Sequence, residues 1–257
     1  MIELEIADGI AEVVLDAPER RNALDASALQ AMSDALMEAE RAGARALVLR
    51  GEGRVFCAGR DISEVDPRTD DTIGFLRDGL QPLLQQLAAF PAPTFAAVQG
   101  AALGVGLGLL IATDVVYVAE TARFGSPFAA LGATLDSGGH ALFFERLGAH
   151  RTLDLIYSGR LMTGAEAVAA GLFSQVLPDD EVLAATRAAA AHAAQGPTLA
   201  FVASKELIRG LRDERLGLWQ SMGGESAAQA ALSETADYRE GFAAFQQKRT
   251  PTFTGLA

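Results

Sequence analysis

The chain has 257 residues, of which half are apolar and 21% are charged, so it can bury a large core and is unlike a disordered protein. Acidic residues outnumber basic ones by 33 to 21, for a net charge of −12, which argues against a nucleic-acid-binding surface. The single cysteine, Cys57, excludes an internal disulfide and favours a reducing compartment. No signal peptide is evident, and glycines interrupt the most apolar segment, 94–112, so we expect a cytoplasmic protein without a membrane span.

Alternating apolar residues and short apolar runs predict a mostly parallel core sheet. The predicted strands are residues 2–6, 10–15, 46–49, 94–98 and 115–118. The first two strands are joined by a turn at Asp8-Gly9, and the next segment is a helix with Asp25 or Ser27 as its N-cap. An acidic, turn-rich stretch at 64–72 predicts a surface loop. Strands that alternate with helices indicate an α/β fold built from crossover units.

The pattern changes near Gly196, beyond which no strand is predicted. The C-terminal part is expected to hold helices at 204–210, 214–231 and 236–248. We therefore predict two regions, an α/β core at 1–195 and a helical C-terminal region at 196–257.

Two segments rich in glycine and small residues, 56–62 and 100–108, lie where a strand is predicted to meet a helix. A helix N-terminus carries free N–H groups and partial positive charge, and glycine lets a ligand approach the main chain closely. Two such turns facing each other would aim two N–H donors at one oxygen, forming an oxyanion hole. Either segment alone is also explained by close packing of a helix on a strand. No ribose-binding acid follows the glycines, which argues against a dinucleotide site.

The order and spacing of several motifs resemble the enoyl-CoA hydratase/isomerase family, the crotonases, over nearly the whole chain. The matching segments are 18–25, 56–61, 100–114, 124–127, 136–139, 158–159, 165–167, 170–172, 240–245 and 248–249. The resemblance implies a right-handed spiral of ββα units and a helical C-terminal region that builds a homotrimer or a hexamer of paired trimers. It implies an acyl-CoA thioester as substrate and no cofactor beyond the CoA moiety of that substrate.

The resemblance also implies the positions of the binding residues. The two oxyanion donors map to the main-chain N–H groups of Ala58 and Val105. The thioester and its pantetheine arm would lie along Ala58 to Asp61, and against Gly104 and Phe128. The remaining CoA contacts, some of them from a neighbouring subunit, map to Arg20, Arg21, Ala23, Phe245 and Lys248. Within the first segment the contacting residues are Gly59, Arg60 and Asp61. The charged residues among these are also explained as ordinary solvated side chains. No metal site is expected, since the three histidines lack ligand spacing.

Hydration of a 2-enoyl thioester needs two carboxylates around a water molecule. At the positions of the two hydratase glutamates this chain has Gly108 and Phe128, neither of which exchanges a proton. Asp136, which directly precedes Ser137-Gly138-Gly139, is the remaining candidate acid/base. Isomerases of the phenylacetate-pathway type carry an aspartate in a similar segment, and one acid/base suffices to move a double bond. Neighbouring phenylalanines would raise its pKa by desolvation. Alternatively, Asp136 caps the following helix.

We therefore predict an enoyl-CoA isomerase that acts by proton transfer through Asp136 in fatty-acid or aromatic-acid breakdown. One alternative is a hydratase (a lyase) that pairs Asp136 with an acid from the loop at 64–71. Another is an acyl-CoA-binding family member without catalytic activity.

Overall fold

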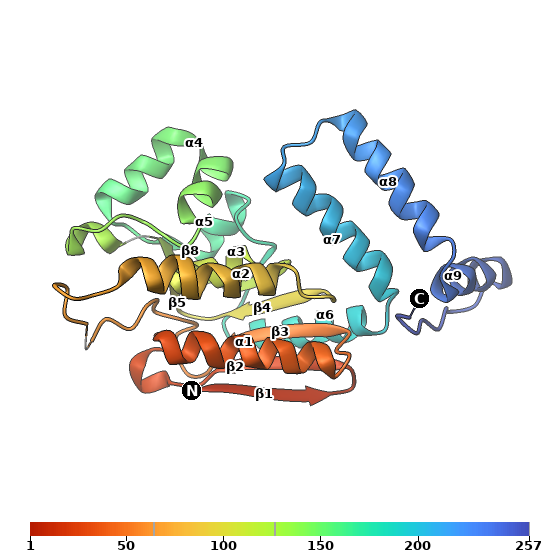
Figure 1. Ribbon diagram of the computed structural model, residues 1–257, viewed down its shortest axis with the longest axis horizontal. Coiled ribbons are helices and arrows are strands. Elements are labelled where there is room, and N and C mark those ends of the chain that lie inside the picture. The colour runs from red at the N-terminus through yellow and green to blue at the C-terminus, as the bar shows by residue number, and fades with distance from the viewer. Residues whose placement is uncertain (64, 126, 257) are drawn as a thin grey trace.

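The computed structural model describes residues 1–63, 65–125 and 127–256. A mixed α/β core carries three further helices at one end (Figure 1). Within the described ranges, no helix is long and apolar enough to cross a membrane.

The main sheet is mostly parallel, as predicted. Its strands are β1 (Ile2–Ala7), β2 (Ile10–Leu15), β3 (Ala46–Gly51), β4 (Thr94–Val98), β6 (Val115–Ala119) and β9 (Gln175–Leu177), in the spatial order β1-β2-β3-β4-β6-β9. Among the strands described in this sheet, only β1 and β2 pair antiparallel, through the turn at Asp8-Gly9. All five predicted strands are present. The sixth, β9, was not predicted because three residues are too few to show a period.

A second, smaller sheet positions the glycine-rich segments. It consists of β5 (Ala101–Leu103), β7 (Arg123–Gly125) and β8 (Met162–Thr163), in the order β5-β7-β8. Cys57 forms an isolated parallel bridge with Ala102, so the segment that precedes Ala58 runs beside β5. This sheet was not predicted, since its strands are too short to be recognised from periodicity.

Helices cover the sheets. In the core they are α1 (Ala26–Arg41), α2 (Gln81–Ala88), α3 (Val105–Ile111), α4 (Gly139–Ser158), α5 (Gly164–Ala169) and α6 (Val182–Ala194). A π-helical turn, η2 (Gly74–Leu80), leads into α2, and two 3₁₀ turns are η1 (Pro18–Arg20) and η3 (Pro127–Leu131). Asp25 is the N-cap of α1, because its carboxylate accepts the N–H of Ala28 at 2.8 Å.

The C-terminal helices are α7 (Thr198–Asp213), α8 (Leu218–Leu232) and α9 (Ala236–Gln247). Of these, α7 is fixed to the core through Lys205, whose Nζ lies 3.0 Å from Oδ2 of Asp114 and donates to the carbonyl of Phe90 at 3.1 Å. In Figure 1, α8 and α9 lie apart from the main sheet. Large apolar side chains on them are exposed, including Trp219 (78%) and Phe245 (85%).

Candidate active site

Helix α3 begins at Val105, directly after a glycine turn. Gly104 has a φ of 51°, a left-handed conformation that favours glycine. Within the described residues, the N–H of Val105 donates no hydrogen bond, as expected for the first residue of a helix. Val105 is buried as a whole residue, only 1% exposed. Its unpaired N–H group therefore lies beneath the surface, at the start of α3.

The assignment of Ala58 as an oxyanion donor is wrong for this structure. The N–H of Ala58 already donates to the carbonyl of Arg21 at 3.0 Å, so it is not free to bind a substrate oxygen. Sequence spacing locates the segment but does not show which of its N–H groups is taken up by a neighbouring strand.

The N–H of Arg60, and not that of Ala58, is the candidate donor in the first glycine-rich segment. The N–H of Asp61 faces Leu24, to whose carbonyl it donates at 2.9 Å, and neighbouring N–H groups of an extended chain point in opposite directions. The N–H of Arg60 therefore faces the side on which Cys57 pairs with β5. It donates no hydrogen bond to the residues that the structure describes.

Arg60 and Val105 each follow, by the same number of residues, a position at which the two glycine-rich segments pair. Cys57 is paired in parallel with Ala102, and three residues further along both chains these positions become Arg60 and Val105. Gly59, which directly precedes Arg60, lies so close to the second glycine-rich segment that a Cβ there would be 3.0 Å from the carbonyl oxygen of Leu103. Both N–H groups therefore belong to the region where the two glycine-rich segments meet.

A glycine in α3 permits this close approach. A Cβ on Gly106 would lie 2.6 Å from the carbonyl oxygen of Cys57, closer than such contacts allow. The absence of a Cβ at Gly106 thus lets α3 pack closely on the segment at Cys57, next to the two unpaired N–H groups.

Phe128 covers the turn that precedes α3. A Cβ on Gly104 would lie 2.7 Å from Cζ of the Phe128 ring, so the ring packs directly on that glycine. Phe128 is partly buried and belongs to η3. The predicted neighbours Gly104 and Phe128 are therefore brought together beside Val105.

Asp136 lies half-buried before α4, and its carboxylate accepts the hydroxyl of Ser137 at 2.8 Å. Burial raises the pKa of this carboxyl, although the Ser137 hydrogen bond and the charges of Arg60 and His140 act in the opposite direction. The N-cap of α4 is Gly138, and no side chain caps the helix. The alternative in which the Asp136 side chain caps α4 is therefore not observed.

The segment that carries Asp136 packs on α3 at Gly108. A Cβ on Gly108 would lie 2.8 Å from Cβ of Ser137 and 3.0 Å from its carbonyl oxygen. Gly108 follows Val105 by three residues, about one helical turn. The structure thus brings the partly buried acid to the helix whose first N–H is free.

The side chain of Arg60 is held by residues that were not predicted. Its guanidinium donates to both carboxylate oxygens of Asp70, at 2.9 and 2.5 Å, and lies 4.2 Å from the ring centroid of Phe75. Such bidentate and cation–π contacts restrict an arginine strongly. No sequence signal identifies this pair, since its members are ten positions apart in a segment without a regular pattern.

The predicted CoA-binding residues separate into two groups. Arg20 lies 3.3 Å from Oδ2 of Asp61, and the carbonyl of Arg21 binds Ala58, so these residues and Ala23 lie beside the first glycine-rich segment. Phe245 and Lys248 lie in and directly after α9, which Figure 1 shows at the end of the molecule away from α3. A single chain does not bring the two groups together.

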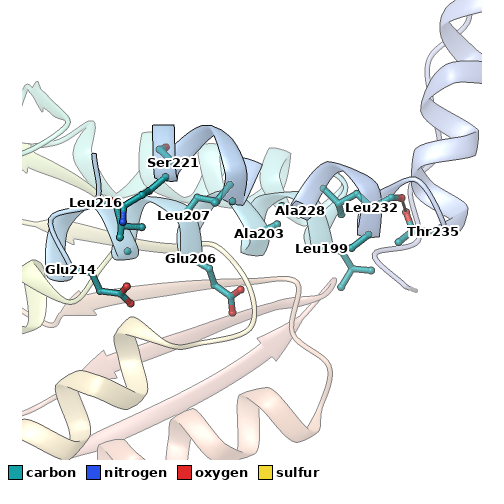
Figure 2. A pocket seen from close by; sticks show the side chains of 14 residues that line it. Leu199, Ala203, Glu206, Leu207, Glu214, Leu216, Ser221, Ala228, Leu232 and Thr235 are labelled. Atoms are coloured by element: carbon teal, nitrogen blue, oxygen red, sulfur yellow. Dashed lines mark hydrogen bonds between the residues drawn. The ribbon is translucent and has the colours of Figure 1, made fainter. Parts of the chain in front are cut away.

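Other features of the chain lie outside this site. Burial raises the pKa of the Cys57 thiol to about 12, so it is not a nucleophile at neutral pH. In the described part of the chain, no three His, Cys, Asp or Glu side chains are grouped to hold a metal ion. Figure 2 shows a separate pocket of about 540 Å³ between α7 and α8, lined by residues such as Leu207 and Ser221.

The fold and site define a mixed α/β protein in which the segment of a partly buried carboxyl packs on the helix whose first N–H group is unpaired, and comparisons with known proteins assign it to a family. The model of the enoyl-CoA hydratase/isomerase family matches residues 5–256. A Rhodobacter capsulatus protein named "Probable enoyl-CoA hydratase" is 38% identical over 254 residues, covering 99% of this chain and 98% of its own. The 1,2-epoxyphenylacetyl-CoA isomerase of Escherichia coli is 34% identical over 256 residues, covering 97% of each chain. The crystal structure of an enoyl-CoA hydratase from Bacillus anthracis superposes with a TM-score of 0.90 at 28% identity, covering 99% of each chain.

The chain belongs to the enoyl-CoA hydratase/isomerase family and has its crotonase fold. Members of this family are enzymes that act on acyl-CoA thioesters. The relatives carry the names of both hydratases and isomerases, so the family assignment leaves the reaction open.

Proposed function

We propose that the protein is an enoyl-CoA isomerase that converts 3-enoyl-CoA to 2-enoyl-CoA. The observation that carries this proposal is one half-buried carboxyl, Asp136, packed through Ser137 on the helix whose first N–H group is free. The N–H groups of Arg60 and Val105 would bind the thioester oxygen. They would stabilise its negative charge better in the enolate than in the substrate.

The proposed reaction needs a single acid/base. Asp136 takes a proton from the α-carbon of the 3-enoyl thioester, and the electron pair of that C–H bond moves into a dienolate whose charge rests on the thioester oxygen. The same carboxyl then returns the proton to the γ-carbon, the double bond forms between the α- and β-carbons, and Asp136 is again a carboxylate. Its raised pKa favours this role, because a base of ordinary aspartate strength removes such a proton poorly.

Hydration with an unusual pair of acids is the second candidate, but it has less support. The loop carboxylates that were considered as partners of Asp136 are already engaged. Asp70 binds Arg60, Asp66 accepts the N–H of Arg68, and Asp71 accepts the N–H of Gly74. Residue 64 lies outside the described residues. A non-catalytic acyl-CoA-binding protein is the third candidate, and the free donors beside Asp136 argue against it.

A product-resolved assay tests the proposal with 3-enoyl-CoA and 2-enoyl-CoA as substrates. We expect conversion of the 3-enoyl substrate by the wild type and a loss of at least about a hundredfold in Asp136→Ala, in line with removal of an acid/base group. An Asp136→Ala variant that retains full turnover refutes the assignment of the base. Rapid hydration of the 2-enoyl substrate by the wild type establishes the hydratase instead. Binding without turnover or α-proton exchange on either substrate establishes the non-catalytic alternative.

The assembly, location and pathway are further parts of the proposal. We propose a homotrimer or a hexamer built through the C-terminal helices, supported by exposed apolar residues such as Trp219 and Phe245. Phe245 and Lys248 would then reach the CoA of a neighbouring subunit. A single, buried cysteine suits the cytoplasm. The 34% identity to 1,2-epoxyphenylacetyl-CoA isomerase supports a role in aromatic-acid breakdown beside the more general role in fatty-acid breakdown.

A further inference from the structure

A groove of about 800 Å³ begins at the proposed active site. It runs between η2 and α2 on one side and α3, the start of α4 and the end of α7 on the other. Gly108 and Ser137, the residues through which the Asp136 segment contacts α3, belong to its lining. Apolar side chains continue the wall beyond them, including Leu80, Leu84 and Ile111. The groove therefore adjoins the proposed active site at the contact between α3 and the Asp136 segment.

Helix α3 gives the distance from the proposed thioester position to the outer part of the groove. Val105, Gly108 and Ala112 follow one another at three- and four-residue spacing, so they lie on one face of the helix. The rise of an α-helix places Ala112 about 10 Å beyond Val105. An acyl chain whose thioester oxygen is bound at Val105 extends along this face. This step rests on the proposed position of the thioester.

The far wall of the groove is cationic, although the chain as a whole carries a net charge of −12. The ionisable residues of its lining are Arg77, Arg209, Arg212 and Asp213. Arg212 lies 2.7 Å from Asp213, and Arg77 lies 2.7 Å from Asp78, so those two charges are largely neutralised. Arg209 has no ion pair or side-chain hydrogen bond with any described residue.

The core anchor of α7 orients Arg209. Lys205, one turn earlier on the same face of the helix, binds Asp114 at 3.0 Å. Arg209 is exposed and lines the groove from the same side of α7 as Lys205. A groove that accepted only neutral alkyl chains gains nothing from a cation at this position.

We propose that the groove binds acyl chains that end in a carboxylate, and that Arg209 is the residue that recognises this distal group. The substrates would then be CoA thioesters of dicarboxylic acids, with one carboxyl group activated as the thioester and the other free. The apolar walls bind the methylene groups, and the guanidinium pairs with the carboxylate at the outer end.

Binding of saturated thioesters tests the proposal without requiring turnover. Titration calorimetry would compare adipoyl-CoA with hexanoyl-CoA, and suberoyl-CoA with octanoyl-CoA, which differ only in the terminal carboxylate. We expect the wild type to bind the better-fitting dicarboxylic thioester at least as tightly as its alkyl counterpart, even though an apolar groove alone disfavours a charge. In Arg209→Gln, we expect binding of that thioester to weaken roughly three- to tenfold, the range between exposed and well-ordered ion pairs.

Two controls separate the causes of any change. Arg41→Gln removes an exposed arginine at the end of α1, outside the groove, and should alter neither affinity. The alkyl thioesters carry the same CoA phosphates, so a uniform loss on both ligands in Arg209→Gln would show that Arg209 binds CoA and would overturn the proposal. Weaker binding of both dicarboxylic thioesters than of their alkyl counterparts by the wild type would overturn it as well. Failure of the isomerase assay leaves this binding comparison intact, so the two proposals fail independently.

Discussion

Replacement of Gly108 by alanine tests whether the contact between α3 and the Asp136 segment holds the catalytic carboxyl in place. The added Cβ would lie 2.8 Å from Cβ of Ser137, 3.0 Å from its carbonyl oxygen and 3.2 Å from Cδ1 of Leu84. Leu84 can rotate, but Ser137 presents main-chain atoms, so the Asp136–Ser137 segment must move away from α3.

We expect Gly108→Ala to change the free energy of unfolding only slightly and kcat strongly. Overpacking of this kind costs about 1–3 kcal/mol, whereas alanine is favoured over glycine within a helix by about 1 kcal/mol. We therefore expect a net loss of roughly 0–2 kcal/mol, equivalent to a decrease in Tm of no more than about 8 °C for a chain of this size. A displacement of the carboxyl by about 1 Å lowers kcat by on the order of a hundredfold. Activity should fall far more than stability.

The assay combines kcat on 3-enoyl-CoA with a thermal unfolding scan. Gly223→Ala in α8 is the matched control, because a Cβ there meets no atom within 4 Å. The control should gain up to about 1 kcal/mol in stability and retain full activity. A Gly108→Ala variant with wild-type kcat would refute the reasoning, since it would mean that Asp136 is positioned independently of its contact with α3.

Three further substitutions probe the proposed acid, a buried ion-pair cluster of the main sheet, and the residue that holds the Arg60 side chain. Because burial raises the pKa of Asp136, the folded state retains this proton to higher pH than the unfolded state, and stability falls as pH rises through that interval. Asp136→Asn should therefore be at least as stable as the wild type at neutral pH, yet inactive, while wild-type kcat/KM should rise with pH as the carboxyl ionises. Burial would raise the pKa of Glu12, but hydrogen bonds from Arg187 and Arg50 outweigh it and hold the pKa low, so its stabilising effect is present near neutrality and disappears on acidification. Glu12→Gln should lose about 2–3 kcal/mol in urea unfolding at neutral pH and less in acid, and an equal loss at both would contradict this account. Asp70→Asn should release the Arg60 side chain and lower kcat about tenfold with little change in KM, and an unchanged kcat would show that the pair does not position the N–H group.

Much of the fold could be predicted from the sequence because its strong patterns are local. The strand pair at β1 and β2 and the cap at Asp25 depend on residues within a few positions of one another. The C-terminal helices were located correctly but were predicted too short at α7, whose apolar face is only partly covered. The strands β5, β7 and β8 depend on pairing between distant segments and leave no local signal.

The candidate site was predicted in part. The two glycine-rich segments meet as expected, and Val105 has a free N–H group. The error at Ala58 arises because its N–H donates to the carbonyl of Arg21, a contact between segments far apart in the sequence that a residue pattern does not show. The pairing of Arg60 with Asp70 was also missed, because it depends on how a loop folds back.

The contact between Gly108 and Ser137 has a consequence for how such enzymes diverge. A glutamate at position 108 would restore one half of a hydratase pair, but its Cβ has no room while Ser137 lies against α3. A glutamate at position 108 is therefore tolerated only if the backbone around position 137 shifts, and that shift would move the proposed acid, Asp136. Arg60 and Val105 would contribute only main-chain N–H groups, so the proposed thioester-binding groups do not depend on which acid is present.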